Sequence, residues 1–95
     1  MSILVRFAPA SMNAEQYDEV SARVKAETHW PPDGLLVHCC FGSGNALRVS
    51  EIWESREKME AFGSQLMPIL SQAGIDVEST PPEFRDVHNV EFGAR

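Results

Sequence analysis

Two short apolar runs, residues 35–41 (LLVHCCF) and residues 46–53 (ALRVSEIW), lie on either side of the connection formed by residues 42–45 (GSGN). Glycine and asparagine adopt positive φ values at little energetic cost, so this connection suits a tight reversal of the chain. The stretch therefore predicts a β-hairpin, which limits how the segments before and after it can be arranged. The hairpin also carries a large share of the groups that could do chemistry: His38, Cys39, Cys40, Glu51 and Trp53.

One strand and one amphipathic helix are predicted before the hairpin. Residues 3–7 (ILVRF) form a short apolar run that a proline ends two positions later, as expected of a strand. Ser11 or Asn13 can cap the helix that follows, whose apolar residues recur every three or four positions. This helix must end by about His29 or Trp30, because two prolines follow and a residue before proline avoids the helical region.

A second helix and a last strand are predicted after the hairpin. Ser55 suits the helix N-cap, and apolar residues recur at helical spacing over residues 59–70. Pro68 lies inside that pattern and removes a backbone donor, so we expect a kink or a tightened last turn there. Gly74 suits the end of the helix, and the imperfect alternation of residues 83–92 predicts the final strand.

The resulting order, strand, helix, strand, strand, helix, strand, predicts an α+β fold of the ferredoxin-like βαββαβ type. In this fold two helices cover one face of a four-stranded antiparallel sheet, and residues 1–95 make a single domain. The predicted strands carry apolar residues on both faces. A second copy of the chain is the simplest cover for the other face, so we expect a homodimer.

Charge and cysteine usage narrow the functional classes. Fourteen acidic and eight basic side chains give a net charge of -6, which disfavours binding to nucleic acid. The apolar run within residues 1–7 is too short for a signal peptide, and no run approaches the length of a membrane span, so we expect a cytoplasmic protein that does not bind membranes. Cys39 and Cys40 are adjacent, which is too close for a disulfide between them, and free thiols fit a reducing compartment.

Four segments carry a resemblance to a known family: residues 32–38 (PDGLLVH), residues 47–55 (LRVSEIWES), the helix around Phe62, and residues 87–90 (VHNV). In order and spacing they resemble the dimeric α+β barrel superfamily, and within it the small proteins similar to antibiotic-biosynthesis monooxygenases. The resemblance implies a homodimer whose two sheets close into a barrel. It also implies a small-molecule pocket between sheet and helices in each subunit.

The heme-degrading branch of this superfamily relies on an asparagine on the first strand, together with a tryptophan and a histidine associated with the second helix. Residues 3–7 contain no asparagine, and the predicted second helix contains neither tryptophan nor histidine. The sequence therefore does not favour heme degradation.

His38 and Glu51 are the candidate catalytic residues. Alternation puts His38 on one strand face with Leu36 and Cys40, where an imidazole in an apolar pocket could accept a proton near neutral pH. The competing interpretation is a core histidine bonded to a backbone carbonyl or a water. Glu51 shares its face with two apolar neighbours, Val49 and Trp53, and could shuttle a proton or orient a histidine.

Glu51 has an alternative role too, because Arg6 or Arg48 could pair with it in a salt bridge.

Trp30, next to two prolines, could form a lid over the pocket mouth or simply pack its loop on the first helix. His88 and Asn89 are neighbours on the predicted last strand, so they face opposite sides. The candidate ligand-binding residues are Trp53, Met59, Phe62, Leu66 and His88.

Metal and phosphate chemistry are not predicted. A site made of His38, Cys40 and His88 lacks the His-x-x-x-His or Cys-x-x-Cys spacing of known metal sites, so we expect no metal and no cofactor. Residues 42–45 join two strands instead of opening a helix, so they do not form a phosphate loop.

The sequence thus predicts a protein that binds a small organic ligand, of aromatic or polyketide-like type. If it is an enzyme, the expected chemistry is cofactor-independent monooxygenation or proton transfer. The alternative is a non-catalytic binding or scaffold protein whose pocket is filled by side chains. A continuous cavity that reaches His38 favours the enzyme, and a filled interior favours the alternative. An open pocket alone is also compatible with a ligand carrier.

Overall fold

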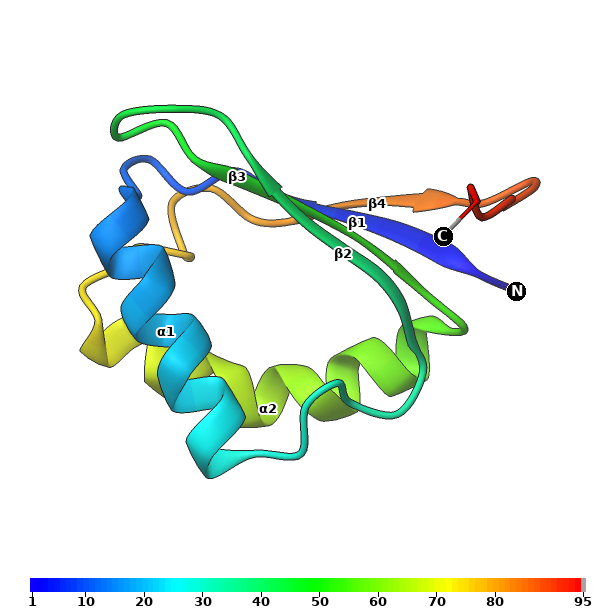
Figure 1. Ribbon diagram of the computed structural model, residues 1–95, viewed down its shortest axis with the longest axis horizontal. Coiled ribbons are helices and arrows are strands. Elements are labelled where there is room, and N and C mark those ends of the chain that lie inside the picture. Colours follow the sequence, from blue (N-terminus) through cyan, green and yellow to red (C-terminus); the bar gives the residue numbers. More distant parts are fainter. Residues whose placement is uncertain (95) are drawn as a thin grey trace.

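The computed structural model describes residues 1–94, which form a four-stranded antiparallel sheet covered on one face by two helices (Figure 1). The strand order is β2-β3-β1-β4, so the two central strands are β3 and β1. This arrangement confirms the predicted ferredoxin-like α+β fold. The elements are β1 (Ile3–Phe7), α1 (Ala14–Glu27), β2 (Leu35–Phe41), β3 (Arg48–Trp53), α2 (Arg56–Gln72) and β4 (Glu83–Asp86).

Side-chain caps fix where both helices begin. Asn13, one of the two predicted candidates, caps α1: its side chain accepts from the backbone N–H of Gln16, and the Gln16 side chain accepts from the backbone N–H of Asn13. This reciprocal pair satisfies two amide donors that a helix N-terminus otherwise leaves free. Ser55 caps α2 as predicted, by accepting from the backbone N–H of Lys58.

The end of α2 is set by a glycine. Pro68, where we expected a kink or a tightened last turn, lies within α2, which continues to Gln72. Gly74 then adopts a φ of +78°, a value that costs glycine little. Its N–H donates to the carbonyl of Ser71, and the N–H of Ile75 donates to that of Leu70, the bond pattern of a Schellman cap.

Strand β2 contains a β-bulge that the alternation rule did not predict. Leu35 lies opposite Trp53, Val37 lies opposite Ile52, and the register shifts between Leu35 and Val37. The extra residue, Leu36, is 37% exposed. The prediction that Leu36 shares the face of His38 is therefore wrong, because the bulge brings Leu35 to that face instead.

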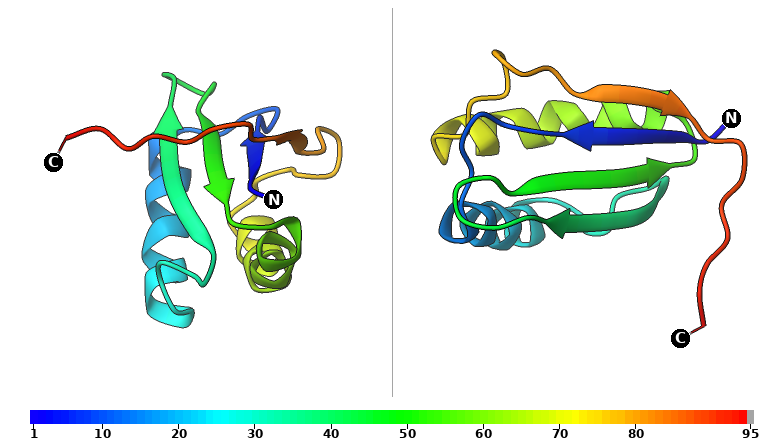
Figure 2. Two further views of the ribbon diagram at one scale, coloured as in Figure 1. Left: turned by 90° about the vertical axis from the view of Figure 1, so that its right-hand side faces the viewer. Right: turned by 90° about the horizontal axis from the view of Figure 1, so that it is seen from above.

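Strand β4 ends at Asp86, so the predicted strand over residues 83–92 is too long. Its pairing partner explains the difference. Asp86 lies opposite Ile3, the first residue of β1, and the N–H of Val87 donates to the carbonyl of Ser2. Beyond that point β1 offers no residues to pair with, and residues 88–94 run past the strand ends and away from the sheet (Figure 2).

The hydrophobic core lies between the sheet and the two helices, and the fully buried Trp53 and Val5 are at its centre. The opposite face of the sheet is left open, and no described segment crosses it in the view from above (Figure 2). Three apolar side chains meet on that face, since Ile52 of β3 is paired with Leu4 of β1 and with Val37 of β2.

Candidate active site

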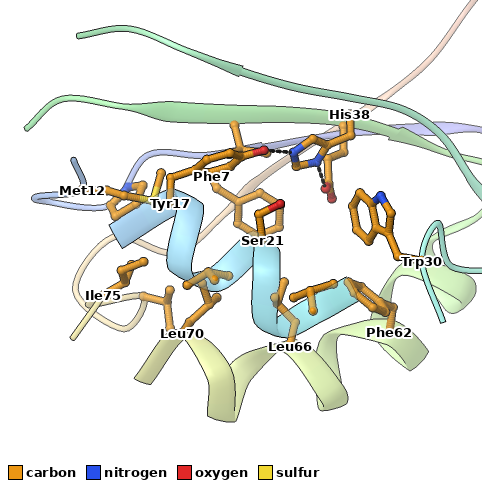
Figure 3. A pocket seen from close by; sticks show the side chains of 16 residues that line it. Phe7, Met12, Tyr17, Ser21, Trp30, His38, Phe62, Leu66, Leu70 and Ile75 are labelled. Carbon is orange, nitrogen blue, oxygen red and sulfur yellow. Dashed lines mark hydrogen bonds and ion pairs between the residues drawn. The ribbon is translucent and has the colours of Figure 1, made fainter. Parts of the chain in front are cut away.

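A cavity of about 90 Å³ lies between the sheet and both helices (Figure 3). Its lining is mostly apolar and comes from β1, α1, β2, β3 and α2, and from the segments that follow β1, α1 and α2. Four polar side chains interrupt this lining: Tyr17, Ser21, His38 and Glu51. The cavity therefore reaches His38, and the protein interior is not filled at this point.

The predicted pair of His38 and Glu51 forms at the floor of the cavity. The two residues are direct partners in the β2–β3 register, and Nδ1 of His38 lies 2.6 Å from Oε2 of Glu51. Glu51 is only 6% exposed, and its other oxygen, Oε1, accepts from the indole N–H of Trp53 at 3.0 Å. Both carboxylate oxygens thus have a partner, as a buried carboxylate requires.

This geometry decides which nitrogen of His38 can act as a base. An ionised carboxylate only accepts hydrogen bonds, so Glu51 holds the proton of a neutral His38 on Nδ1. The lone pair is then on Nε2, on the side of the ring away from Glu51. The alternative partners of Glu51 do not form: Arg6 lies opposite Ser50 on the other sheet face, and Arg48 donates to the backbone carbonyls of Pro9 and Leu47.

Tyr17 of α1, which is not among the predicted site residues, completes the group. Its hydroxyl oxygen lies 2.6 Å from Nε2 of His38 (Figure 3). Burial raises the pKa of the Tyr17 hydroxyl above its ordinary value, and the nearby Cys40 and Glu51 raise it further. Tyr17 therefore keeps its proton at neutral pH, and its hydroxyl donates a hydrogen bond to Nε2. The available signal was a lone tyrosine in an apolar helix stripe, whose hydroxyl needs a partner once buried.

Two aromatic side chains form the wall beside His38. Trp30 meets the imidazole edge-on, with ring centroids 5.4 Å apart, and Phe62 of α2 lies 6.1 Å from Trp30. Both line the cavity, as does Leu66. Trp30 is thus part of the cavity wall, next to the candidate base.

The remaining predicted ligand-binding residues lie elsewhere. Trp53 and Met59 are buried in the core and do not line the cavity, and Trp53 reaches the site only through its bond to Glu51. His88 is exposed on the segment after β4, so within the described chain it is not brought to the cavity. Its neighbour Asn89 donates to the carboxylate of Glu91.

Both cysteines are free thiols, and they lie on opposite faces of β2. Cys39 is exposed on the open sheet face. Cys40 is half-buried against the core, and burial raises the pKa of its thiol, which keeps it protonated and unreactive.

Among residues 1–94, no three His, Cys, Asp or Glu side chains are grouped so as to hold a metal ion. None of the helices described is long and apolar enough to cross a membrane.

The sequence matches no protein-family model, and no curated protein matches it significantly. Solved structures do resemble it. A candidate antibiotic biosynthesis monooxygenase from Chloroflexus aurantiacus superposes with a TM-score of 0.63 at 12% identity, covering 98% of this chain and 100% of that one. The fold is that of the antibiotic-biosynthesis-monooxygenase-like proteins.

Two further structures show the same likeness. SnoaB, a cofactor-independent oxygenase from Streptomyces nogalater, superposes with a TM-score of 0.57 at 11% identity, covering 94% of this chain and 93% of that one. NE2512 from Nitrosomonas europaea, a protein of unknown function, superposes with a TM-score of 0.59 at 17% identity, covering 99% of this chain and 94% of that one. At these identities the likeness concerns the fold, so the function has to be argued from the site itself.

Proposed function

We propose that this protein is a homodimeric, cofactor-independent oxygenase that removes a proton from a small aromatic or polyketide-like compound bearing a weakly acidic hydroxyl. The observation that carries the proposal is the position of His38. Its Nδ1 is fixed by a buried carboxylate, and its Nε2 lies at the wall of an apolar cavity. A base oriented in this way is what proton abstraction in a water-poor site requires.

The proposed reaction starts with transfer of the hydroxyl proton of the substrate to Nε2 of His38. Glu51 stabilises the imidazolium that forms, as the carboxylate does in other histidine-based sites. The resulting phenolate gives one electron to O2, and the radical pair joins through a new bond between ring carbon and oxygen. The peroxide anion formed in this way takes the proton back from Nε2 of His38, and loss of water from the resulting hydroperoxide leaves a quinone. One oxygen atom of O2 ends in the product and the other in water, so the substrate supplies all the electrons.

The apolar character of the cavity supports this chemistry in a second way. A phenolate that reacts with O2 must be kept from bulk water, which would return its proton before oxygen adds. The lining offers few groups that could protonate it. The likeness to SnoaB, a cofactor-independent oxygenase, favours the same class of reaction.

The homodimer part of the proposal is supported by the open sheet face. Leu4, Val37 and Ile52 form an apolar patch there that neither helix covers. A second copy placed face to face would bury both patches at once, because a two-fold axis presents the same surface twice. The family resemblance implies the same assembly.

A non-catalytic ligand-binding protein is the second candidate. One observation favours it: the lone pair of Nε2 is already taken by the hydroxyl of Tyr17. A site whose base is occupied at rest could hold a ligand without reacting with it.

Turnover of a model compound separates the two candidates. Anthrone suits this purpose because its phenol tautomer, once ionised, reacts with O2 to give anthraquinone and water. We expect the protein to accelerate this reaction in the presence of labelled O2, with one labelled atom in the quinone. His38→Ala should lower the rate at least about 100-fold, the usual contribution of a general base. His29→Ala, which changes an exposed histidine outside the cavity, is the matched control.

Binding of anthrone without any acceleration would favour the carrier. An unchanged rate in His38→Ala would remove His38 as the base.

A further inference from the structure

The hydrogen bond between Tyr17 and His38 covers the only lone pair that the candidate base offers. Nε2 lies 2.6 Å from the Tyr17 hydroxyl, and Nδ1 is held by Glu51. A substrate hydroxyl that gives its proton to Nε2 must therefore take the place that Tyr17 now occupies. The Tyr17 hydroxyl therefore has to move away from Nε2, and it then needs another hydrogen-bond acceptor.

The cavity needs a donor for the anion that proton transfer leaves behind. An oxyanion in an apolar cavity without a hydrogen bond would be strongly disfavoured. Glu51 cannot serve, because a carboxylate only accepts and both its oxygens are already bonded. The donors near His38 are the protonated Nε2 itself, the Tyr17 hydroxyl, the Ser21 hydroxyl and the indole N–H of Trp30.

Geometry favours Tyr17 among the side chains other than His38. An oxygen that replaces the Tyr17 hydroxyl at Nε2 lies within one hydrogen-bond length of where that hydroxyl was, so a small displacement of the phenol is enough to keep contact. Burial raises the pKa of Tyr17, so its proton stays on the phenol and is not passed to the weakly basic ligand anion. Tyr17 can thus donate a hydrogen bond to the anion without protonating it.

We propose that Tyr17 is a further catalytic residue: on substrate binding its hydroxyl leaves Nε2 of His38 and donates to the substrate oxygen that replaces it. Tyr17 then covers the base in the empty site and forms, with the protonated Nε2, an oxyanion-binding pair in the occupied one. The proton moves only from the substrate oxygen to Nε2, and Tyr17 keeps its own. This inference rests on the proposed function, since it takes His38 as the base.

Binding of 4-nitrophenol tests the inference without any oxygenation, because its ionised form absorbs visible light and its protonated form does not. At a pH where the free compound is mostly protonated, we expect the wild-type protein to bind it as the phenolate. Tyr17→Phe should weaken binding of the phenolate about 10- to 100-fold, the usual effect of one hydrogen bond to a charged group. His38→Gln should bind the protonated form only.

Substituted phenols of graded acidity give a readout that a purely structural role would not change. In the wild type the bound phenolate accepts two hydrogen bonds, and in Tyr17→Phe it accepts one. The slope of the logarithm of affinity against the pKa of the phenol should therefore differ between the two proteins. Gln16→Ala is the matched control for damage to α1. It removes half of the capping box at the neighbouring position and leaves Tyr17 in place.

Three outcomes would count against the inference. Equal or tighter phenolate binding by Tyr17→Phe would overturn it and leave His38 as the base. A loss in Gln16→Ala equal to that in Tyr17→Phe would reduce Tyr17 to a packing residue. Binding of protonated nitrophenol by the wild type would remove both the oxyanion pair and the base. Normal phenolate binding without anthrone turnover would instead contradict the oxygenase proposal alone.

Discussion

Nδ1 of His38 and Oε2 of Glu51 lie 2.6 Å apart because the two residues are direct partners across the β2–β3 pair. Directly opposed side chains on one sheet face have their Cβ atoms about 5 Å apart, so histidine and glutamate are each long enough to meet without strain. The register is regular from Val37 to Phe41, beyond the bulge at Leu36, and the hairpin thus builds the candidate dyad from its own register.

Replacing Glu51 by glutamine should disable the base without unfolding the protein. An indole only donates, so the amide oxygen of the new side chain must face Trp53, and its NH2 group must then face Nδ1 of His38. The histidine is forced to carry its proton on Nε2 and loses the lone pair there. We expect anthrone turnover to fall by about 10²- to 10⁴-fold, with near-native thermal unfolding.

Nitrogen NMR of His38 would test the cause directly. We expect the wild type to carry the proton on Nδ1 and Glu51→Gln to carry it on Nε2. Glu57→Gln, an equal change at an exposed position of α2, should alter neither tautomer nor rate. A retained Nδ1 proton with a reduced rate would mean that the charge of Glu51, and not the tautomer, is what matters.

Tyr17 is the only tyrosine of the chain, so its ionisation can be followed by ultraviolet absorbance without ambiguity. Burial raises its pKa above the ordinary value of about 10, so the folded protein should titrate at a higher pH than the urea-unfolded chain. The unfolded chain therefore loses this proton first. Stability that is complete below about pH 10 should be lost as the pH rises through the folded pKa.

Tyr17→Phe supplies the comparison for this titration, since it lacks the ionisable hydroxyl. Its free energy of unfolding should fall less steeply with pH above about 10 than that of the wild type. Equal midpoints in the folded and unfolded wild type would show that the hydroxyl is freely hydrated in the folded protein, which is incompatible with its bond to His38.

Trp53 should matter to stability through its indole N–H as well as its size. It is fully buried and donates to Oε1 of Glu51, so Trp53→Phe leaves a buried carboxylate oxygen without a partner. An unpaired neutral group costs about 1–3 kcal/mol and a charged one more, in addition to the cost of the smaller ring. Urea unfolding should show this loss.

The double variant with Glu51→Gln isolates the polar part of that loss. A neutral amide is less costly to leave unpaired than a carboxylate, so Trp53→Phe should cost less in that background. Equal costs in the two backgrounds would show that Trp53 contributes only by packing.

Local signals in the sequence were sufficient to predict the six elements and the candidate dyad. The helices begin at the caps Asn13 and Ser55, and α2 ends at Gly74. Each of these residues makes its hydrogen bond within a few positions along the chain, so sequence spacing is enough to predict it. His38 and Glu51 stand in adjacent strands of one hairpin, so pairing rules alone bring them near each other.

Three features depend on contacts between distant segments and could not be read in this way. The length of β4 is set by where β1 begins, and the bulge at Leu36 is set by how β2 pairs with β3. The role of Tyr17 depends on how α1 lies on the sheet, because its partner His38 is 21 residues away in the sequence. Helical spacing identifies the buried face of α1 but not what that face meets.

A lysine at Ile52 should prevent the proposed dimer. Ile52 lies on the open sheet face at the middle of three paired strands, between Leu4 and Val37. A two-fold axis places the substitution in the interface twice, so each dimer would bury two unpaired ammonium groups in place of two apolar side chains. We expect the wild type to sediment as a dimer at micromolar concentration, and Ile52→Lys to associate at least about 100-fold more weakly. Ala22→Lys makes the same charge change on the exposed side of α1 and should remain dimeric, whereas a wild type that sediments as a monomer would contradict the assembly.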